Sequence, residues 1–327
     1  MDEIRLKELV AQTGGILLEK ELVARTWGNI SVRCDENRFA ISPSGLGYEN
    51  MTAEDVPVYD MRDDTWVGSR KPSSEKKVHA AAYKIYPDVD FVIHTHQDYA
   101  TAVGLTGTDG LKLTPEEEKI LGRIEVAQYG LPGTKKLGDN VEAALKKGSK
   151  VILMKHHGVL ILGADRDETI RKAELLEEVC KRAVEEKLGR NDDKPSDTID
   201  GKLLSASQNM EILDSGDALF MANRGGFRAQ LDDMAQMLGG GIRAVDNDNA
   251  SILRELNRRD AVLVKNVGCV ILTEKKDDAT ALKLLLKKAA MAKHYTIACG
   301  VEARLSAFDC MLMRYNYVKK YSKQKEG

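Results

Sequence analysis

The sequence predicts a layered α/β protein, because short apolar strands and longer amphipathic helices alternate along its first half. The first helix is expected over residues 3–24, where apolar side chains recur at helical spacing. Short strands are expected at residues 30–33, 38–41 and 56–60, because the Asn, Asp, Gly and Pro residues between them are typical of turns.

The same alternation continues towards the middle of the chain. The expected elements are a helix from Ser74, a strand over 91–96, a short helix over 139–147, a strand over 151–155 and a long helix over 167–188. The acidic residues 114–118 are expected to form a mobile stretch. Residues 189–201 are polar and include Pro195 and several Asp residues, which indicates a connector to a second region.

The composition is that of a soluble, intracellular protein. Hydrophobic residues make up 43% of the chain, and the net charge of −2 provides no general attraction to nucleic acid or membrane. The five cysteines are far apart and form no CxxC pair, which favours reduced thiols in a cytosol. The charged, amphipathic residues 1–9 are not expected to be a signal peptide, and no apolar run reaches membrane-spanning length. We therefore expect a cytoplasmic location and neither nucleic-acid nor membrane partners.

Two histidines one residue apart end an apolar run, Val92-Ile93-His94-Thr95-His96. In an extended strand alternate side chains share a face, so His94 and His96 project together while Thr95 points away. Two neutral imidazoles that converge in this way suit a first-row divalent cation. The alternative is that the pair serves packing or hydrogen bonding within the sheet.

A second histidine pair, His156-His157, follows the apolar residues 151–154 and precedes Gly158. Adjacent strand residues face opposite ways, so only one of the two imidazoles can join the first pair at a metal. Gly158 would allow the backbone to turn or to approach its neighbours closely. The pattern predicts a third ligand here without saying which histidine supplies it.

A carboxylate follows two serines in Ser73-Ser74-Glu75, at the start of an alanine-rich helical stretch. Free backbone N–H groups at a helix start can bind an anion such as phosphate, although the serines can equally be helix caps. Glu75 is expected in the first turn, either as a reactive carboxylate or as a solvated residue that the helix dipole favours. His79 lies four residues on, and we interpret it as packing or as support behind the site.

Five short motifs thus follow one another along the first half. They are Thr26-Trp27-Gly28-Asn29-Ile30-Ser31, Ile41-Ser42-Pro43-Ser44-Gly45, Ser73-Ser74-Glu75, His94-Thr95-His96 and His156-His157-Gly158. In order and spacing they resemble the signature of the class II aldolase/adducin family. The resemblance covers roughly residues 1–212 and implies a catalytic domain there, a three-layer α/β/α sandwich on a mainly antiparallel central sheet.

The resemblance also implies a role for each motif. His94, His96 and His157 would bind a divalent cation, Zn²⁺ in the first place, with Mn²⁺, Co²⁺ or Fe²⁺ as alternatives. Glu75 would be the catalytic acid/base, while the cation would polarise the substrate carbonyl and stabilise an enediolate. The phosphate of a small phosphorylated sugar would be bound by Gly28, Asn29, Ser44, Gly45, Ser73 and Ser74.

The sequence departs from the family pattern in two places. Trp27 replaces the small residue expected before Gly28, which affects the shape of the pocket. Fuculose-phosphate aldolases carry a catalytic tyrosine in the loop after the first histidine pair, whereas residues 111–121 contain none. Tyr129 lies further along, and the pattern does not tell whether it reaches the site. The proton donor for the aldehyde oxygen is therefore unassigned.

The predicted function is a metal-dependent aldolase that cleaves a ketose 1-phosphate to dihydroxyacetone phosphate and an aldehyde. A sugar-phosphate 4-epimerase, a dehydratase or a non-catalytic adducin-like scaffold are the alternatives. Three histidines and Glu75 argue against the scaffold, and glutamate at 75, where epimerases tend to carry aspartate, favours aldolase or dehydratase. The family also implies a homo-oligomer, either a dimer or a tetramer.

The C-terminal region, residues 213–327, is expected to be a degenerate partial copy of the first domain with a structural role. Residues 260–272 repeat the pattern of residues 150–162, and residues 217–223 resemble the strand at 90–96. On this alignment the three ligand positions hold Met221, Asn223 and Val267. The second copy is therefore not expected to bind a metal.

Overall fold

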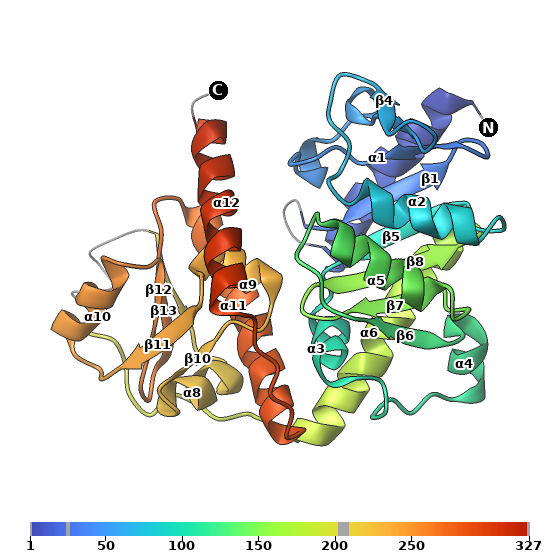
Figure 1. Ribbon diagram of the computed structural model, residues 1–327. Helices are drawn as coiled ribbons and strands as arrows, with labels where there is room; N and C mark the ends of the chain where they lie inside the picture. The colour runs from blue at the N-terminus through green and yellow to red at the C-terminus, as the bar shows by residue number, and fades with distance from the viewer. Residues whose placement is uncertain (1, 24–26, 202–208, 326–327) are drawn as a thin grey trace. The chain divides into compact units, whose positions relative to one another are not determined.

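A computed structural model describes residues 2–23, 27–201 and 209–325 (Figure 1). The chain divides into two compact units, unit 1 (Met1–Ala183) and unit 2 (Val184–Gly327). The division falls inside the long helix α6 (Arg166–Leu188), earlier in the chain than the boundary after residue 212 that the motifs suggest. Each unit has its own sheet and its own buried core.

An eight-stranded sheet forms the centre of unit 1, in the order β4-β3-β2-β1-β5-β8-β7-β6. All neighbouring strands are antiparallel except β6 and β7, which are parallel. The strands are β1 (Asn29–Arg33), β2 (Arg38–Ile41), β3 (Val58–Asp60), β4 (Thr65–Val67), β5 (Phe91–Thr95), β6 (Ile124–Ala127), β7 (Val151–Met154) and β8 (Gly158–Gly163). The mainly antiparallel sheet is confirmed.

Helices cover both faces of this sheet. They are α1 (Glu3–Glu19), α2 (Lys76–Ile85), α3 (Asp98–Thr106), α4 (Pro115–Leu121), α5 (Lys135–Leu145) and α6, with short 3₁₀ turns at Tyr48–Asn50 and Ala53–Asp55. Val78 of α2 and Val141 of α5 share one core cluster with Ile152 of β7. The next residue, Leu153, faces Gly104 of α3 on the other side, since alternate strand residues point to opposite faces. The three-layer α/β/α class is therefore confirmed.

Several predicted boundaries were wrong, mostly where local capping decides them. Helix α1 ends at Glu19, and residue 24 of the expected helix lies outside the described residues. The acidic stretch is an ordered helix, α4, because Thr114 and Glu117 form a reciprocal capping box and Pro115 occupies the first turn. Strands β4, β6 and β8 and helix α3 were missed, and α5 begins at Lys135 rather than at 139.

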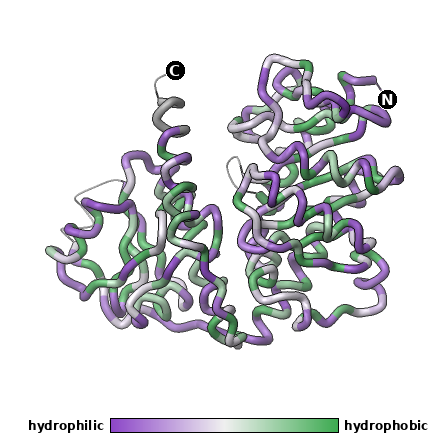
Figure 2. The backbone as a smooth tube through the Cα atoms, viewed as in Figure 1, coloured by the Kyte–Doolittle hydropathy of each residue, from purple (hydrophilic) through white to green (hydrophobic). Residues whose placement is uncertain are grey.

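Unit 2 contains a five-stranded sheet in the order β10-β11-β12-β13-β9. Its strands are β9 (Met210–Leu213), β10 (Gly226–Arg228), β11 (Gly241–Val245), β12 (Ala261–Val264) and β13 (Gly268–Leu272). Its helices are α8 (Gly216–Asn223), α9 (Asp232–Leu238), α10 (Asn249–Leu256), α11 (Lys276–Ala298) and α12 (Ala307–Lys325). Figure 2 shows that hydrophobic segments lie mainly inside each unit. Within the described ranges, no helix has the length and apolarity that crossing a membrane requires.

The two sheets share an order of strand pairing. β12 pairs with β11 in parallel and with β13 in a tight hairpin, as β7 does with β6 and β8. β13 is also antiparallel to β9, as β8 is to β5. This correspondence supports a duplication of part of unit 1, which we propose as the origin of unit 2.

The ligand positions of the proposed second copy need a correction. Residues 217–223, aligned above with a strand, belong to helix α8. Strand β9 takes that place, and Leu213 pairs with Cys269 as Thr95 pairs with Val159. The counterparts of His94 and His96 are then Ile212 and Asp214, neither of which is an imidazole.

Candidate functional site

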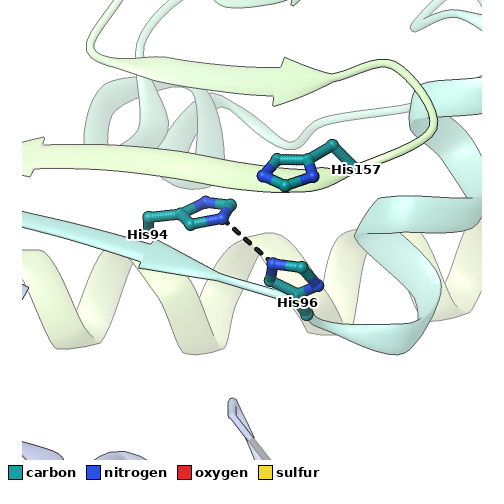
Figure 3. Close-up of side chains that lie close together, drawn as sticks. All are labelled: His94, His96 and His157. Atoms are coloured by element: carbon teal, nitrogen blue, oxygen red, sulfur yellow. Dashed lines mark hydrogen bonds between the residues drawn. The ribbon is translucent and has the colours of Figure 1, made fainter. Parts of the chain in front are cut away.

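Three histidines converge at one end of the central strands of unit 1 (Figure 3). His94 is on β5, His96 follows the end of that strand, and His157 is in the turn between β7 and β8. One ligand nitrogen from each lies within 4.8 Å of the others, and the Nε2 atoms of His94 and His96 are 3.0 Å apart. The predicted pair and one histidine of the second motif are thus brought together.

The adjacent His156 points elsewhere because of the turn that carries it. Its φ of +68° is in the left-handed region, which is uncommon for a residue with a side chain, and the His157 N–H closes the turn on the Met154 carbonyl at 2.9 Å. The His156 ring packs edge-on against Tyr129, with ring centroids 5.2 Å apart. The turn therefore directs His157 into the cluster and brings Tyr129 next to it.

His94 is held in the form that a metal ligand requires. Its Nδ1–H donates to the Val159 carbonyl at 2.8 Å, so its Nε2 carries the lone pair that faces the cluster. Burial lowers the pKa of His94 well below its usual value, although the charge of Glu75 opposes the shift. The imidazole is therefore neutral at neutral pH, which is the state that binds cations.

Glu75 places a buried carboxylate beside this cluster. Its Oε1 accepts from His157 Nε2 at 2.8 Å, and its Oε2 lies 3.3 Å from His94 Nε2. Burial alone would raise the pKa of Glu75, but His157 and a hydrogen bond from Asn29 hold it well below its usual value. Three imidazoles and one ionised carboxylate fit a divalent cation such as Zn²⁺. Glu75 is the N-cap residue of α2, just before the first turn in which it was predicted.

The residues predicted to bind phosphate come from three adjoining segments. The β1–β2 pairing continues to Ser42, whose N–H donates to the Ile30 carbonyl at 2.9 Å, next to the Gly28-Asn29 motif. A bridge between Pro43 and Pro72 brings the Ser44-Gly45 motif beside the Ser73-Ser74 motif. These motifs are adjacent, and we treat their binding of phosphate as a proposal.

The serines and glycines of these segments differ in their surroundings. Ser73 is buried, and its Oγ accepts the Glu75 N–H at 3.3 Å, whereas Ser44 and Ser74 are exposed. A Cβ at Gly28 would lie 2.4 Å from the His94 carbonyl oxygen, and its φ is +93°. Only glycine fits there, because a side chain would press on the strand that carries the histidines.

Two residues are placed in ways that sequence patterns did not reveal. Asn29 is buried, and its Nδ2 donates to Glu75 Oε2 at 2.9 Å, so it contacts the carboxylate. Trp27 stacks over the His96 ring with centroids 6.4 Å apart, which explains how a large residue is accommodated before Gly28. Thr26, the first residue of that motif, lies outside the described residues.

Comparison with known proteins identifies the class to which this fold and cluster belong. A family model for the class II aldolase and adducin N-terminal domain matches residues 8–184. The chain therefore belongs to the class II aldolase and adducin family, whose aldolases depend on a divalent metal. The matched residues include all three histidines of the cluster and Glu75.

Individual relatives differ in the reaction that their names describe. The chain is 31% identical over 186 residues to a 3-oxo-tetronate 4-phosphate decarboxylase of Haemophilus influenzae, covering 55% of this chain and 88% of that protein. It is 32% identical over 166 residues to an L-fuculose phosphate aldolase of Methanococcus maripaludis, covering 51% and 89%. A solved L-fuculose 1-phosphate aldolase superposes with a TM-score of 0.50 at 26% identity, covering 62% of this chain and 93% of its own.

Proposed function

We propose that this protein is a divalent-metal-dependent lyase that breaks a carbon–carbon bond in a phosphorylated keto sugar. The observation that carries the proposal is the convergence of His94, His96 and His157 around the buried carboxylate of Glu75. The names of both relatives above describe cleavage of a carbon–carbon bond in a phosphorylated substrate. Family membership and this geometry together support a lyase.

In this proposal the three histidines hold the cation, with Zn²⁺ as the first choice for a site of three nitrogens. The bound cation would act as a Lewis acid towards the substrate carbonyl. Glu75 moves a proton to or from the carbon next to that carbonyl, because it is the ionised carboxylate beside the ligands. Trp27 shields His96 from one side through its stacked ring.

The substrate phosphate would be bound by donors that remain after the internal hydrogen bonds are made. Ser73 Oγ accepts from the Glu75 N–H, so its own hydroxyl proton is free to donate to phosphate. The amide nitrogen of Asn29 carries two hydrogens, and one of them binds Glu75. The second hydrogen is proposed to bind the substrate phosphate. The proposed phosphate site also includes the hydroxyls of Ser44 and Ser74 and the backbone of Gly28 and Gly45.

The finer proposal is aldol cleavage of a ketose 1-phosphate to dihydroxyacetone phosphate and an aldehyde. Decarboxylation of a phosphorylated 3-keto sugar acid is the second candidate, favoured by the decarboxylase relative. The absence of tyrosine from residues 111–121 also favours it, because loss of carbon dioxide needs no acid/base partner for an aldehyde oxygen. The homo-oligomeric state stays a prediction.

The test is a product screen with Zn²⁺-loaded protein. Ketose 1-phosphates are assayed for dihydroxyacetone phosphate, and a 3-keto-tetronate 4-phosphate is assayed for carbon dioxide, each beside the unphosphorylated compound. We expect one of the two products, from phosphorylated substrate only. Glu75→Gln should lower turnover by roughly 10²–10⁴-fold, the usual contribution of general acid–base catalysis.

The matched control is Glu118→Gln, a change of the same type at an exposed position on α4, which should leave turnover unchanged. Neither product from metal-loaded protein, or full turnover in Glu75→Gln, would contradict the proposed function. Release of carbon dioxide without dihydroxyacetone phosphate would replace the aldolase with the decarboxylase.

A further inference from the structure

A buried chain of hydrogen bonds leads away from Glu75 into the core of unit 1. Asn29 Nδ2 donates to Glu75 Oε2 at 2.9 Å, and Asn29 Oδ1 contacts His79 Nε2. His79 Nδ1 is 2.6 Å from Ser31 Oγ, which is 2.7 Å from the hydroxyl of Tyr83. His79 and Ser31 are fully buried, and Tyr83 is 2% exposed. The links beyond Asn29 therefore lie out of reach of solvent.

Two regular elements bring these groups together. Glu75, His79 and Tyr83 are spaced four residues apart at the N-cap and along α2, so they share one side of the helix. Asn29 and Ser31 are alternate residues of β1 and therefore share one face of the strand. The helix side and the strand face meet, and each polar group on one finds its partner on the other.

The ionised carboxylate of Glu75 determines which group donates and which accepts in every hydrogen bond of this series. An ionised carboxylate only accepts, so the amide nitrogen of Asn29 faces Glu75 and its carbonyl oxygen faces His79. A carbonyl oxygen also only accepts, so His79 Nε2 must carry a hydrogen. In the neutral ring Nδ1 then has the lone pair, accepts from Ser31, and leaves Ser31 Oγ to accept from Tyr83.

We propose that His79 is a positioning residue, whose Nε2–H fixes the orientation of the Asn29 amide and thereby the place of the Glu75 carboxylate. If the amide were flipped, its oxygen would face the carboxylate and its nitrogen would face an N–H group. An apolar side chain would fill this core at a lower desolvation cost than a fully buried imidazole. The proposal rests on the proposed catalytic role of Glu75.

The kinetic test compares three variants of the metal-loaded, full-length protein. His79→Leu removes the donor and should lower kcat by about 10–100-fold, as loss of a supporting partner typically does. His79→Gln keeps an amide N–H near the place of Nε2 and should restore most of kcat. Val78→Ala, at the buried neighbour on α2, controls for loss of packing and should keep kcat.

An independent test needs no turnover. Nitrogen-15 spectra of histidine-labelled wild-type protein should show His79, identified by its loss in His79→Gln, as the neutral Nε2–H tautomer. An Nδ1–H tautomer would overturn the proposal, and so would equal kcat in His79→Leu and Val78→Ala. Failure of the proposed function would look different, because wild-type protein would then release neither lyase product while the tautomer was as predicted.

Discussion

Burial sets the protonation state of His79, one helical turn after Glu75. It lowers the pKa of His79 from 6.5 to about 4, against the opposing charge of Glu75. The folded protein therefore keeps this ring neutral at pH values where the unfolded chain protonates it. Between these two pKa values the unfolded state binds more protons, so stability rises with pH across that window and is lost on acidification.

We expect the free energy of unfolding to fall by about 3 kcal/mol through His79 alone as the pH drops from 6.5 towards 4. Urea denaturation of wild type and of His79→Gln, each followed from pH 7 to pH 4, measures this directly. The variant should show a shallower dependence on pH, since glutamine does not titrate. If the free energy of unfolding depended on pH equally in the two proteins, the lowered pKa of His79 in the folded state would be contradicted.

The sequence could identify single site residues only where the local backbone geometry is regular. Alternation along a strand correctly paired His94 with His96. It could not separate His156 from His157, because the left-handed backbone of His156 decides that and histidine gives no signal of it. The contact between Tyr129 and His156 joins two different loops, and no pattern within either loop reveals it.

At the scale of elements, the hairpin of β7 and β8 pairs directly with β5, the strand that carries His94 and leads into His96. A Cβ at Gly158 would lie 2.3 Å from the Thr95 carbonyl oxygen and 2.9 Å from His94 Cε1. Both distances are too short for a methyl group, so β5 or the hairpin would have to move. Gly158 is therefore needed for the close approach of two elements that carry all three histidines.

Gly158→Ala should leave a folded protein that binds the metal at least 10-fold more weakly, a loss comparable to that of a supporting partner. Competition with a chromogenic chelator measures the affinity, and circular dichroism checks the fold. Gly138→Ala is the control, because Gly138 lies in α5 with open space around its Cβ position. Equal affinity in the two variants would show that the hairpin tolerates the methyl group.

Helix and strand were confused where a segment is short and apolar. The pattern of residues 217–223 is compatible with a helix or a strand. The Ser215 side chain favours helix α8, because it accepts the Ala218 N–H as an N-cap. The capping box of α4 was also readable in Thr114-Pro115-Glu116-Glu117. Strands β5 and β7 and helix α6 were predicted to within one residue at each end, whereas the six-residue strand β8 was missed.

At the scale of the whole molecule, the proposed metal site lies in unit 1, and the described residues of unit 2 hold no comparable histidine cluster. Unit 2 repeats the hairpin pairing, and Asn266, with φ of +62°, occupies the turn position of His156. Its counterparts of the three ligands are Ile212, Asp214 and Val267, which do not form a set of imidazoles. The fold class could be predicted from the motifs, whereas the division inside α6 could not, because that helix runs without interruption.

A zinc titration of the metal-free protein tests the central claim most directly. Bound Zn²⁺ is measured by elemental analysis after gel filtration, together with turnover on whichever substrate the product screen identifies. We predict that binding and turnover rise together and saturate at about one equivalent per chain. The double variant His94→Ala, His96→Ala should neither bind nor turn over. Saturation at two equivalents, or turnover by metal-free protein, would contradict this account.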